Sequence, residues 1–226
     1  HVGTFANDIS FTVLIAQNIV QSWNANKAST VPSSITLGIP EGPYLDCATD
    51  EGNAKFREAC NELADYGIEI RSINAMFDYK DIVDKHHEIV AAEAAIVHEH
   101  WFQLYSDVYN DRTADLILRG QSISNDQLST AIQNRLRLRE ELQNLMDIHN
   151  IDLWISPSAP GVAPKGLQST GDPIMNLPWT HSGLPTISIP NRKNEQGLPF
   201  GLQLSGRFGE DETLFAVASG IEQMLI

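Results

Sequence analysis

The chain has 226 residues, 42% of them hydrophobic, which suits one large globular domain or two small ones. Its 15 Lys and Arg against 29 Asp and Glu give a net charge of −14, which argues against nucleic acids and anionic membrane surfaces as partners. No apolar run approaches the ~18 residues that a membrane span needs, and nothing resembles a signal peptide.

The two cysteines, Cys47 and Cys60, do not make a disulfide framework in a chain of this length, and no Cys-x-x-Cys spacing occurs. We therefore expect free thiols in a reducing compartment, the cytoplasm. Because the chain begins with His1 rather than Met, we also expect a fragment, a processed product or a chain trimmed at its start.

The N-terminal third predicts a helix followed by a strand–helix–strand unit. Asp8 is a good N-cap for the first helix, Pro40 stops the first strand, and Gly67 suits the position after the second helix. A unit of this kind builds two parallel strands. The predicted elements are a helix at 8–21, a loop at 22–34, a strand at 35–40, a helix at 53–66 and a strand at 68–73.

The remainder adds a long helical stretch and then more strands, so the whole order predicts the α/β class with a helical insertion at about 80–150. The predicted elements are helices at 81–105 and 125–149, a strand at 151–155, a loop rich in Pro, Gly and Ser at 158–171, a strand at 186–189, a polar turn at 191–197, a strand at 200–204 and a helix at 210–224.

Four histidines on one predicted helix are the clearest candidates for a metal site: His86, His87, His98 and His100. A helical zinc site needs two histidines at positions i and i+4, and no two of these four have that spacing. Glycines in the loop at 158–171 lack the spacing of a phosphate loop, and no Gly-x-Ser-x-Gly elbow occurs. We therefore expect neither a metal ion nor a nucleotide cofactor.

An ordered set of motifs fills the last fifty residues. It begins with Asn-Leu-Pro-Trp-Thr-His-Ser-Gly-Leu-Pro at 176–185, followed by Thr-Ile-Ser-Ile-Pro at 186–190. Gly-Leu-Pro-Phe-Gly-Leu-Gln-Leu at 197–204, Gly-Arg at 206–207 and Asp-Glu-Thr-Leu at 211–214 complete it. This order and spacing resembles the C-terminal signature of the amidase signature family.

Two further stretches agree with this resemblance. Asp-Leu-Trp-Ile-Ser-Pro-Ser-Ala-Pro at 152–160 looks like the family's segment of an Asp, an apolar strand and two prolines. Val-Gly-Thr-Phe-Ala at 2–6 looks like its Val-Gly-Pro-x-Ala-Arg segment, although Thr4 and Asn7 stand where the family usually has Pro and Arg. The resemblance thus covers nearly the whole chain but only the second half of the family's domain.

The resemblance implies an amide hydrolase fold, a mixed β-sheet flanked by helices, of which residues 1–226 form the C-terminal portion of a single domain. Family members use a Lys–Ser–Ser triad with a serine nucleophile, and all three residues precede the segment that here begins at Val2. We therefore expect no catalytic residue in this chain and an inactive, truncated fragment.

The resemblance also implies that the segment before Gly183-Leu184-Pro185 borders the acyl pocket. The substrate-binding candidates there are Asp172, Met175, Asn176, Trp179 and Thr180, with Gly171 beside them. Trp179 either walls the pocket or packs in the core. Asp172 lies near the position where tRNA-dependent amidotransferase A subunits hold the amino group of glutamine, or else caps a loop. Arg119 corresponds more weakly to an arginine of the same amidotransferase subunits, and His181 matches no residue with a known role in the family.

Three functions remain open. The chain is a portion of an enzyme that cleaves a small-molecule amide, an A subunit of a tRNA-dependent amidotransferase, or a non-catalytic binding or assembly subunit. The pair Trp179-Thr180, where amidotransferase subunits tend to carry Ala-Asn, favours the amidase. Because half of the domain would be absent, we expect either self-association or pairing with the missing N-terminal half.

Overall fold

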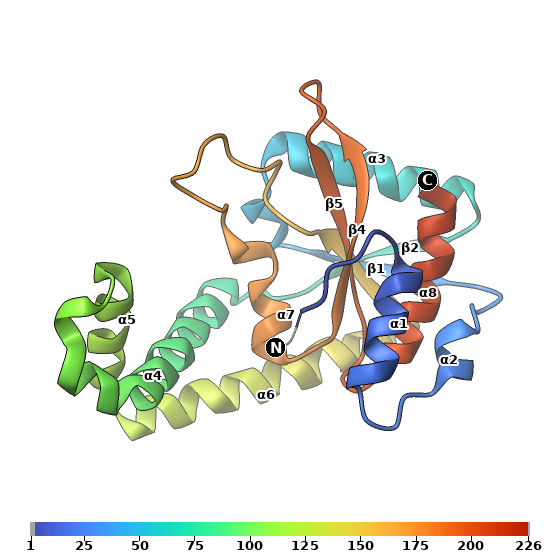
Figure 1. Cartoon of the computed structure of the whole chain (residues 1–226). Coiled ribbons are helices and arrows are strands. Elements are labelled where there is room, and N and C mark those ends of the chain that lie inside the picture. Colours follow the sequence, from blue (N-terminus) through green and yellow to red (C-terminus); the bar gives the residue numbers. More distant parts are fainter. Residues whose placement is uncertain (1–2, 226) are drawn as a thin grey trace.

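A computed structural model describes residues 3–225, so Val2 of the N-terminal motif lies outside the described residues. Eight α-helices, three short 3₁₀ helices and five strands follow one another along this part of the chain (Figure 1). Their order is α1 (Ile9–Ile19), α2 (Ala25–Ser29), β1 (Thr36–Glu41), η1 (Leu45–Cys47), α3 (Asp50–Asp65), β2 (Glu69–Asn74), α4 (Tyr79–Tyr105), η2 (Ser106–Val108), α5 (Asp111–Gln121), α6 (Asn125–Ile148), β3 (Leu153–Pro157), η3 (Pro173–Met175), α7 (Leu177–Ser182), β4 (Thr186–Lys193), β5 (Pro199–Ser205) and α8 (Asp211–Leu225).

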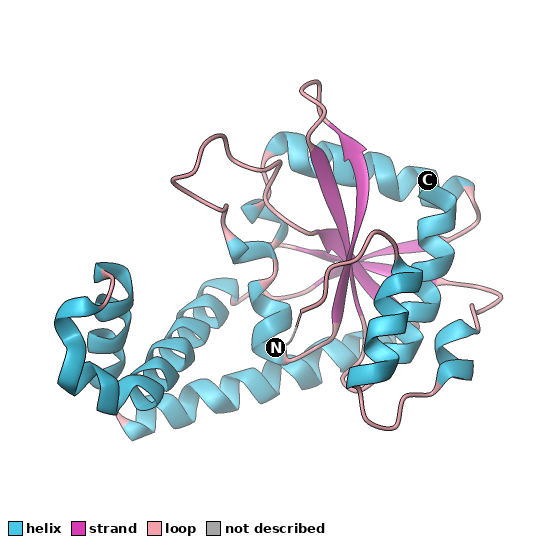
Figure 2. Cartoon of the chain, viewed as in Figure 1, coloured by secondary structure: helices cyan, strands magenta, loops and turns pink. Residues whose placement is uncertain are grey.

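The five strands form one mixed sheet with the order β2-β1-β3-β5-β4, seen as a strongly twisted fan in Figure 2. β1 pairs in parallel with both β2 and β3, whereas β5 runs antiparallel to β3 and β4. The parallel β1–α3–β2 unit and the predicted α/β class with a mixed sheet are therefore confirmed. β2 and β4 are the two edges of this sheet.

Three strands continue through prolines that we expected to end them. β1 passes Pro40 and reaches Glu41, and Pro40 pairs only with Ile73 of β2, because the pairing of β1 with β3 stops at Gly38. β3 reaches Pro157, which pairs only with Leu202 of β5, while the pairing of β3 with β1 stops at Trp154. β4 continues past Pro190 to Lys193 with a local irregularity, and β4 is an edge strand. A proline lacks an N–H to donate, so it is tolerated where one side of a strand has no partner.

Three helices differ from the sequence-based expectation. The expected loop at 22–34 contains α2, whose N-cap Asn24 accepts a hydrogen bond from the N–H of Lys27. α5 follows the N-cap Asn110, and α7 begins at Leu177 with proline in its first turn and ends at Gly183, whose φ is +74°. All three are short, and α2 and α7 have too few residues for a clear helical period.

The helical stretch between β2 and β3 is built from α4, α5 and α6. α4 and α5 extend away from the sheet in Figure 1, while α6 runs back toward it. Gly120 of α5 lies against α4 so closely that a Cβ atom there would be 1.9 Å from the carbonyl oxygen of Ala91. This contact requires glycine, and it lets the two helices of the projecting pair pack backbone to backbone.

The core lies between the sheet and the helices that contact it. α3 and α8 contact the sheet and each other, whereas α4, α6 and α7 contact one another. Trp154 of β3 and Trp179 of α7 are the largest fully buried side chains. Within residues 3–225, no helix has both the length and the apolar character to cross a membrane.

Candidate functional site

A fully buried group of polar side chains lies beneath the predicted substrate-binding segment. The hydroxyl of Tyr44 accepts a hydrogen bond from Nε1 of Trp179 at 3.0 Å and lies 2.9 Å from Oγ of Ser156 and 2.8 Å from the carbonyl oxygen of Met175. Nε2 of Gln203 donates to the same two oxygens, each at 3.2 Å. These contacts connect β3, β5, η3 and α7 with the residue that precedes η1, so they fix the position of α7 on the sheet.

The sheet register explains part of this group. Ser156 of β3 pairs directly with Gln203 of β5, so their side chains meet on one face of adjacent strands. Burial raises the pKa of Tyr44, so its hydroxyl stays protonated and keeps its single O–H donor. Tyr44 was not a sequence candidate, because it lies far from α7 in the sequence and nothing local marks it.

The predicted substrate-binding residues divide between two faces of η3 and α7. Met175 and Trp179 are buried four residues apart, and Trp179 packs edge-on against the ring of Tyr44. Asp172, Asn176 and Thr180 are exposed, also at spacings of four. Residues four apart share one helix face, so the sequence candidates form an inner face that anchors the segment and an outer face that meets solvent.

The polar side chains of Asp172 and Asn176 also hold this segment in place. The carboxylate of Asp172 accepts a hydrogen bond from the N–H of Ile174 at 2.9 Å and so caps η3. Nδ2 of Asn176 donates to the carbonyl oxygen of Ser158 at 3.1 Å, just after β3 ends. The exposed face therefore lies beside the loop that follows β3, at the C-terminal end of that strand.

Tyr79 and Cys47 border the same segment. The hydroxyl of Tyr79 donates to the carbonyl oxygen of Ile174 at 2.6 Å. Burial raises the pKa of the Cys47 thiol, and the nearby carboxylates of Asp46 and Asp172 raise it further. Cys47 is therefore a protonated thiol at neutral pH and is poorly suited to act as a nucleophile.

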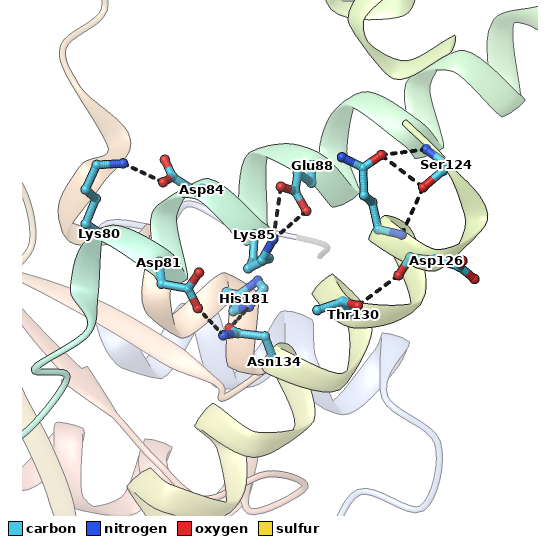
Figure 3. A network of polar contacts seen from close by, with 11 residues as sticks. Lys80, Asp81, Asp84, Lys85, Glu88, Ser124, Asp126, Thr130, Asn134 and His181 are labelled. Atoms are coloured by element: carbon cyan, nitrogen blue, oxygen red, sulfur yellow. Dashed lines mark hydrogen bonds and ion pairs between the residues drawn. The ribbon is translucent and has the colours of Figure 1, made fainter. Parts of the chain in front are cut away.

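A second polar network joins α7 to the helical stretch (Figure 3). Nε2 of His181 lies 3.0 Å from Oδ1 of Asn134 on α6, and Nδ2 of Asn134 donates to Asp81 on α4 at 2.8 Å. Because Asn134 gives its N–H to Asp81, its oxygen accepts from His181, which fixes the proton of His181 on Nε2. The ring of His86 packs edge-on against His181, with centroids 5.6 Å apart.

The remaining histidines that were considered for a metal site, and Arg119, do not come together in one place. Nδ1 of His98 lies 2.9 Å from the hydroxyl of Tyr109, while His87 and His100 are exposed. Arg119 is exposed on α5, away from α7. No group of three or more His, Cys, Asp and Glu side chains between residues 3 and 225 could hold a metal ion.

Four of the six lysines form ion pairs with carboxylates. They are Lys27 with Glu210, Lys55 with Glu58, Lys80 with Asp84, and Lys85 with Glu88. Two surface hollows lie elsewhere, one on the outside of α6 around Glu141 and one between β3 and the start of α8 around Asp152 and Arg207. Neither includes a predicted substrate-binding residue.

Comparison with solved structures identifies the fold. A crystal structure of an amidase superposes with a TM-score of 0.78 and 23% identity, covering 88% of this chain and 47% of that one. A bacterial aryl acylamidase of the amidase signature enzymes gives a TM-score of 0.71 and 16% identity, covering 88% of this chain and 44% of that one.

Sequence relatives of two kinds align with the chain. The A subunit of the glutamyl-tRNA(Gln) amidotransferase of Trichormus variabilis is 38% identical over 96 residues, which are 39% of this chain and 19% of that protein. Indoleacetamide hydrolase of Allorhizobium ampelinum is 25% identical over 232 residues, which are 88% of this chain and 50% of that protein. The chain thus spans half or less of the length of these relatives.

The family model for amidases matches residues 1–215, almost the whole chain. This match agrees with the motifs at 152–160 and 176–214, and with the superposition on amidase signature enzymes. The chain therefore belongs to the amidase family.

Proposed function

We propose that this chain is the C-terminal portion of a cytoplasmic amide hydrolase and supplies one wall of the acyl pocket. The observation that carries the proposal is the arrangement of η3 and α7. Met175 and Trp179 anchor the segment to Tyr44, while Asp172, Asn176 and Thr180 face outward at the end of β3. A wall held by buried hydrogen bonds keeps its outward side chains in fixed positions, which is what substrate orientation requires.

In the intact enzyme, the reaction would follow the chemistry of the family. A neutral lysine takes a proton from the bridging serine, which activates the nucleophilic serine toward the amide carbonyl. Backbone N–H groups stabilise the oxyanion, the amine leaves, and water releases the acyl group. We assign none of the triad to this chain, because Lys27 and Lys85 lie in ion pairs with Glu210 and Glu88, and the buried Ser156 is hydrogen-bonded to Tyr44 and Gln203.

A role as the A subunit of a tRNA-dependent amidotransferase is the alternative, favoured by the 38% identity to such a subunit over 96 residues. That subunit would require an acid to hold the amino group of glutamine. Asp172 is exposed in the right segment, but its carboxylate already caps η3. The alignment with indoleacetamide hydrolase extends over 88% of this chain, so we favour an amidase that acts on a small amide. A non-catalytic binding or assembly subunit is the remaining alternative.

Ammonia release from a panel of small amides, including indole-3-acetamide and glutamine, tests the proposal. This chain alone should give no turnover above buffer, whereas the full-length product of its gene should be active. In that product, Thr180→Ala and Asn176→Ala should change KM or kcat/KM by about tenfold, because each removes a contact worth about 1.4 kcal/mol. Leu198→Ala, on the turn between β4 and β5, is the control and should leave both constants unchanged.

Each outcome separates the hypotheses. Turnover by this chain alone would show that a serine, lysine or histidine within it is catalytic. If the full-length product released ammonia from glutamine but from no other amide of the panel, and Asp172→Asn abolished that release, the amidotransferase would be favoured. If the full-length product released ammonia from no amide of the panel, the non-catalytic binding or assembly role would be favoured.

A further inference from the structure

The outer side of α4 carries large apolar side chains that no other part of the described chain covers. Val97, Trp101, Leu104 and Tyr105 are each more than half exposed, with Trp101 at 55% and Val97 at 67%. Val108, in the adjoining η2, is 75% exposed. These five residues form what we name the arm stripe, and they lie on the helical pair that projects from the body of the molecule in Figure 1.

The arm stripe is a second apolar face of α4, distinct from the one that packs on its neighbours. The inner face consists of small buried residues, Ala91, Ala92 and Ala95, and it lies against α5. At about 100° per residue, the stripe residues on α4 all fall within roughly 60° of Trp101. An outward row of Trp, Leu, Tyr and Val is costly to leave in water and marks an interaction surface.

Charge decides what kind of partner suits this surface. Between residues 86 and 111 there is no Lys or Arg, so nothing near the stripe attracts phosphate groups or anionic lipid headgroups. The carboxylates of this segment all lie outside the stripe: Glu88, Glu93, Glu99, Asp107 and Asp111. An uncharged aromatic centre within a polar rim is typical of the core of a protein–protein interface.

The pattern of the stripe is complementary to itself. If a second α4 lies antiparallel with the two Trp101 residues at the centre, each residue before Trp101 faces the residue at the same distance after it. Val97 then faces Tyr105 of the other copy, and Leu104 faces His98, whose ring packs edge-on against Trp101 of its own helix. Aliphatic side chains therefore meet aromatic rings on both sides of the central Trp101 pair. A two-fold interface requires this kind of self-matching patch.

The exposed apolar area of the arm stripe is comparable to what one partner contributes to a protein–protein interface. Two half-exposed aromatic residues together with three exposed aliphatic ones offer on the order of 500 Å² per copy, since Trp and Tyr each present ~150–250 Å². A standard interface takes ~800 Å² from each partner. The stripe therefore supplies most of such an interface, and Trp and Tyr are the residue types that contribute most to binding.

We propose that the arm stripe is a two-fold dimerisation surface, through which α4 packs antiparallel against α4 of a second copy of this chain with Trp101 at the centre. The proposal does not depend on amide hydrolysis. It concerns the face that α4 exposes in this chain, and not a longer product in which an N-terminal portion of the domain packs on the same face.

Sedimentation velocity of this chain over a range of concentrations tests the proposal. The chain should sediment as a dimer that dissociates on dilution, and Trp101→Ala should weaken the dimer at least tenfold. Ile96→Ala is the matched control, because Ile96 is 65% exposed on α4 but points about 140° away from Trp101. Far-UV circular dichroism should show unchanged helix content in both variants, since each side chain is mostly exposed.

A charge-exchange pair tests the antiparallel register. Val97→Glu and Tyr105→Lys should each weaken the dimer, because each places a charge opposite an apolar residue. The double variant should recover association, because the new carboxylate at position 97 of one copy would then face the new ammonium group at position 105 of the other. Within one helix, these two positions are about two turns apart.

Four results would overturn the proposal: a monomeric wild-type chain at every concentration, equal effects of Trp101→Ala and Ile96→Ala, no recovery in the double variant, or binding of the monomer to phosphatidylcholine vesicles that Trp101→Ala abolishes. The last result would assign the stripe to a lipid surface instead of a second copy.

Discussion

His181 is a histidine held neutral at the junction of three helices. It is 1% exposed, and burial lowers its pKa to about 4, with the neighbouring charges of His86, Arg135 and Arg137 acting in the same direction. Its Nε2–H donates to Asn134, while Nδ1 has no hydrogen-bond partner among the described residues. A proton on Nδ1 would therefore add a buried charge and a buried N–H with no acceptor.

This arrangement predicts that the protein loses stability in mild acid. The unfolded chain takes up a proton near pH 6.5, whereas folded His181 does not until about pH 4, so acid favours the unfolded state between these values. The loss should reach at most about 3 kcal/mol, at 1.36 kcal/mol per pKa unit. Urea unfolding at pH 7.0 and pH 4.5 measures it, and His181→Asn should show a smaller difference between the two pH values.

Tyr44 provides a second test at the scale of single residues. In Tyr44→Phe, the N–H of Trp179 loses its acceptor and the carbonyl oxygen of Met175 loses a donor, both in a fully buried place. We expect unfolding free energy to fall by about 1–3 kcal/mol. Tyr66→Phe is the control, because Tyr66 is 58% exposed and should change stability little. Equal stabilities of the two variants would mean that the buried group does not anchor α7.

At the scale of elements, the contact between α4 and α5 depends on Gly120. In Gly120→Ala the new methyl group would lie 1.9 Å from the carbonyl oxygen of Ala91 and 2.8 Å from Cβ of Ala95, so the helices would have to move apart. We expect a loss of at least about 1–3 kcal/mol. Hydrogen exchange should speed up in α5 and in the C-terminal half of α4, while the strands keep their protection.

The matched control for this variant is Leu118→Ala, since Leu118 lies on the same helix and is 53% exposed. It should leave exchange in α4 unchanged. If Gly120→Ala speeds exchange throughout the sheet as well, the projecting helical pair does not open as a separate unit.

For the whole molecule, the net charge of −14 opposes any association of two copies. Salt screens this repulsion, so the dimer proposed for the arm stripe should become tighter as salt rises from about 50 to about 500 mM. The change in dissociation constant by sedimentation measures the effect. A dimer that weakens in salt would instead point to ion pairs across the interface, which the stripe residues cannot form.

The sequence by itself determined the class, the family and most elements of this protein. Helical and strand periods are local, so they locate α1, α3, α4, α6 and α8 within a few residues of their ends, and the parallel pairing of β1 with β2 follows from their connection. The ordered motifs at 176–214 lead to the amidase family, whose model matches residues 1–215. Cys60, one of the two cysteines expected to be free thiols, is buried in the core.

Only the tertiary structure decided which residues hold the candidate site together. Tyr44, Ser156, Gln203 and Trp179 are distant in the sequence, and their hydrogen bonds exist because the sheet register and the turn before η1 bring them to one buried place. The same is true of His181 with its partner Asn134. Likewise, strand prolines are tolerated where a strand lacks a partner on one side, and periodicity alone does not show which side is free. Local sequence patterns specify helices and strands, because their periods involve neighbouring residues. Which side chains are buried, and which distant residues become their hydrogen-bond partners, is decided only when the chain folds.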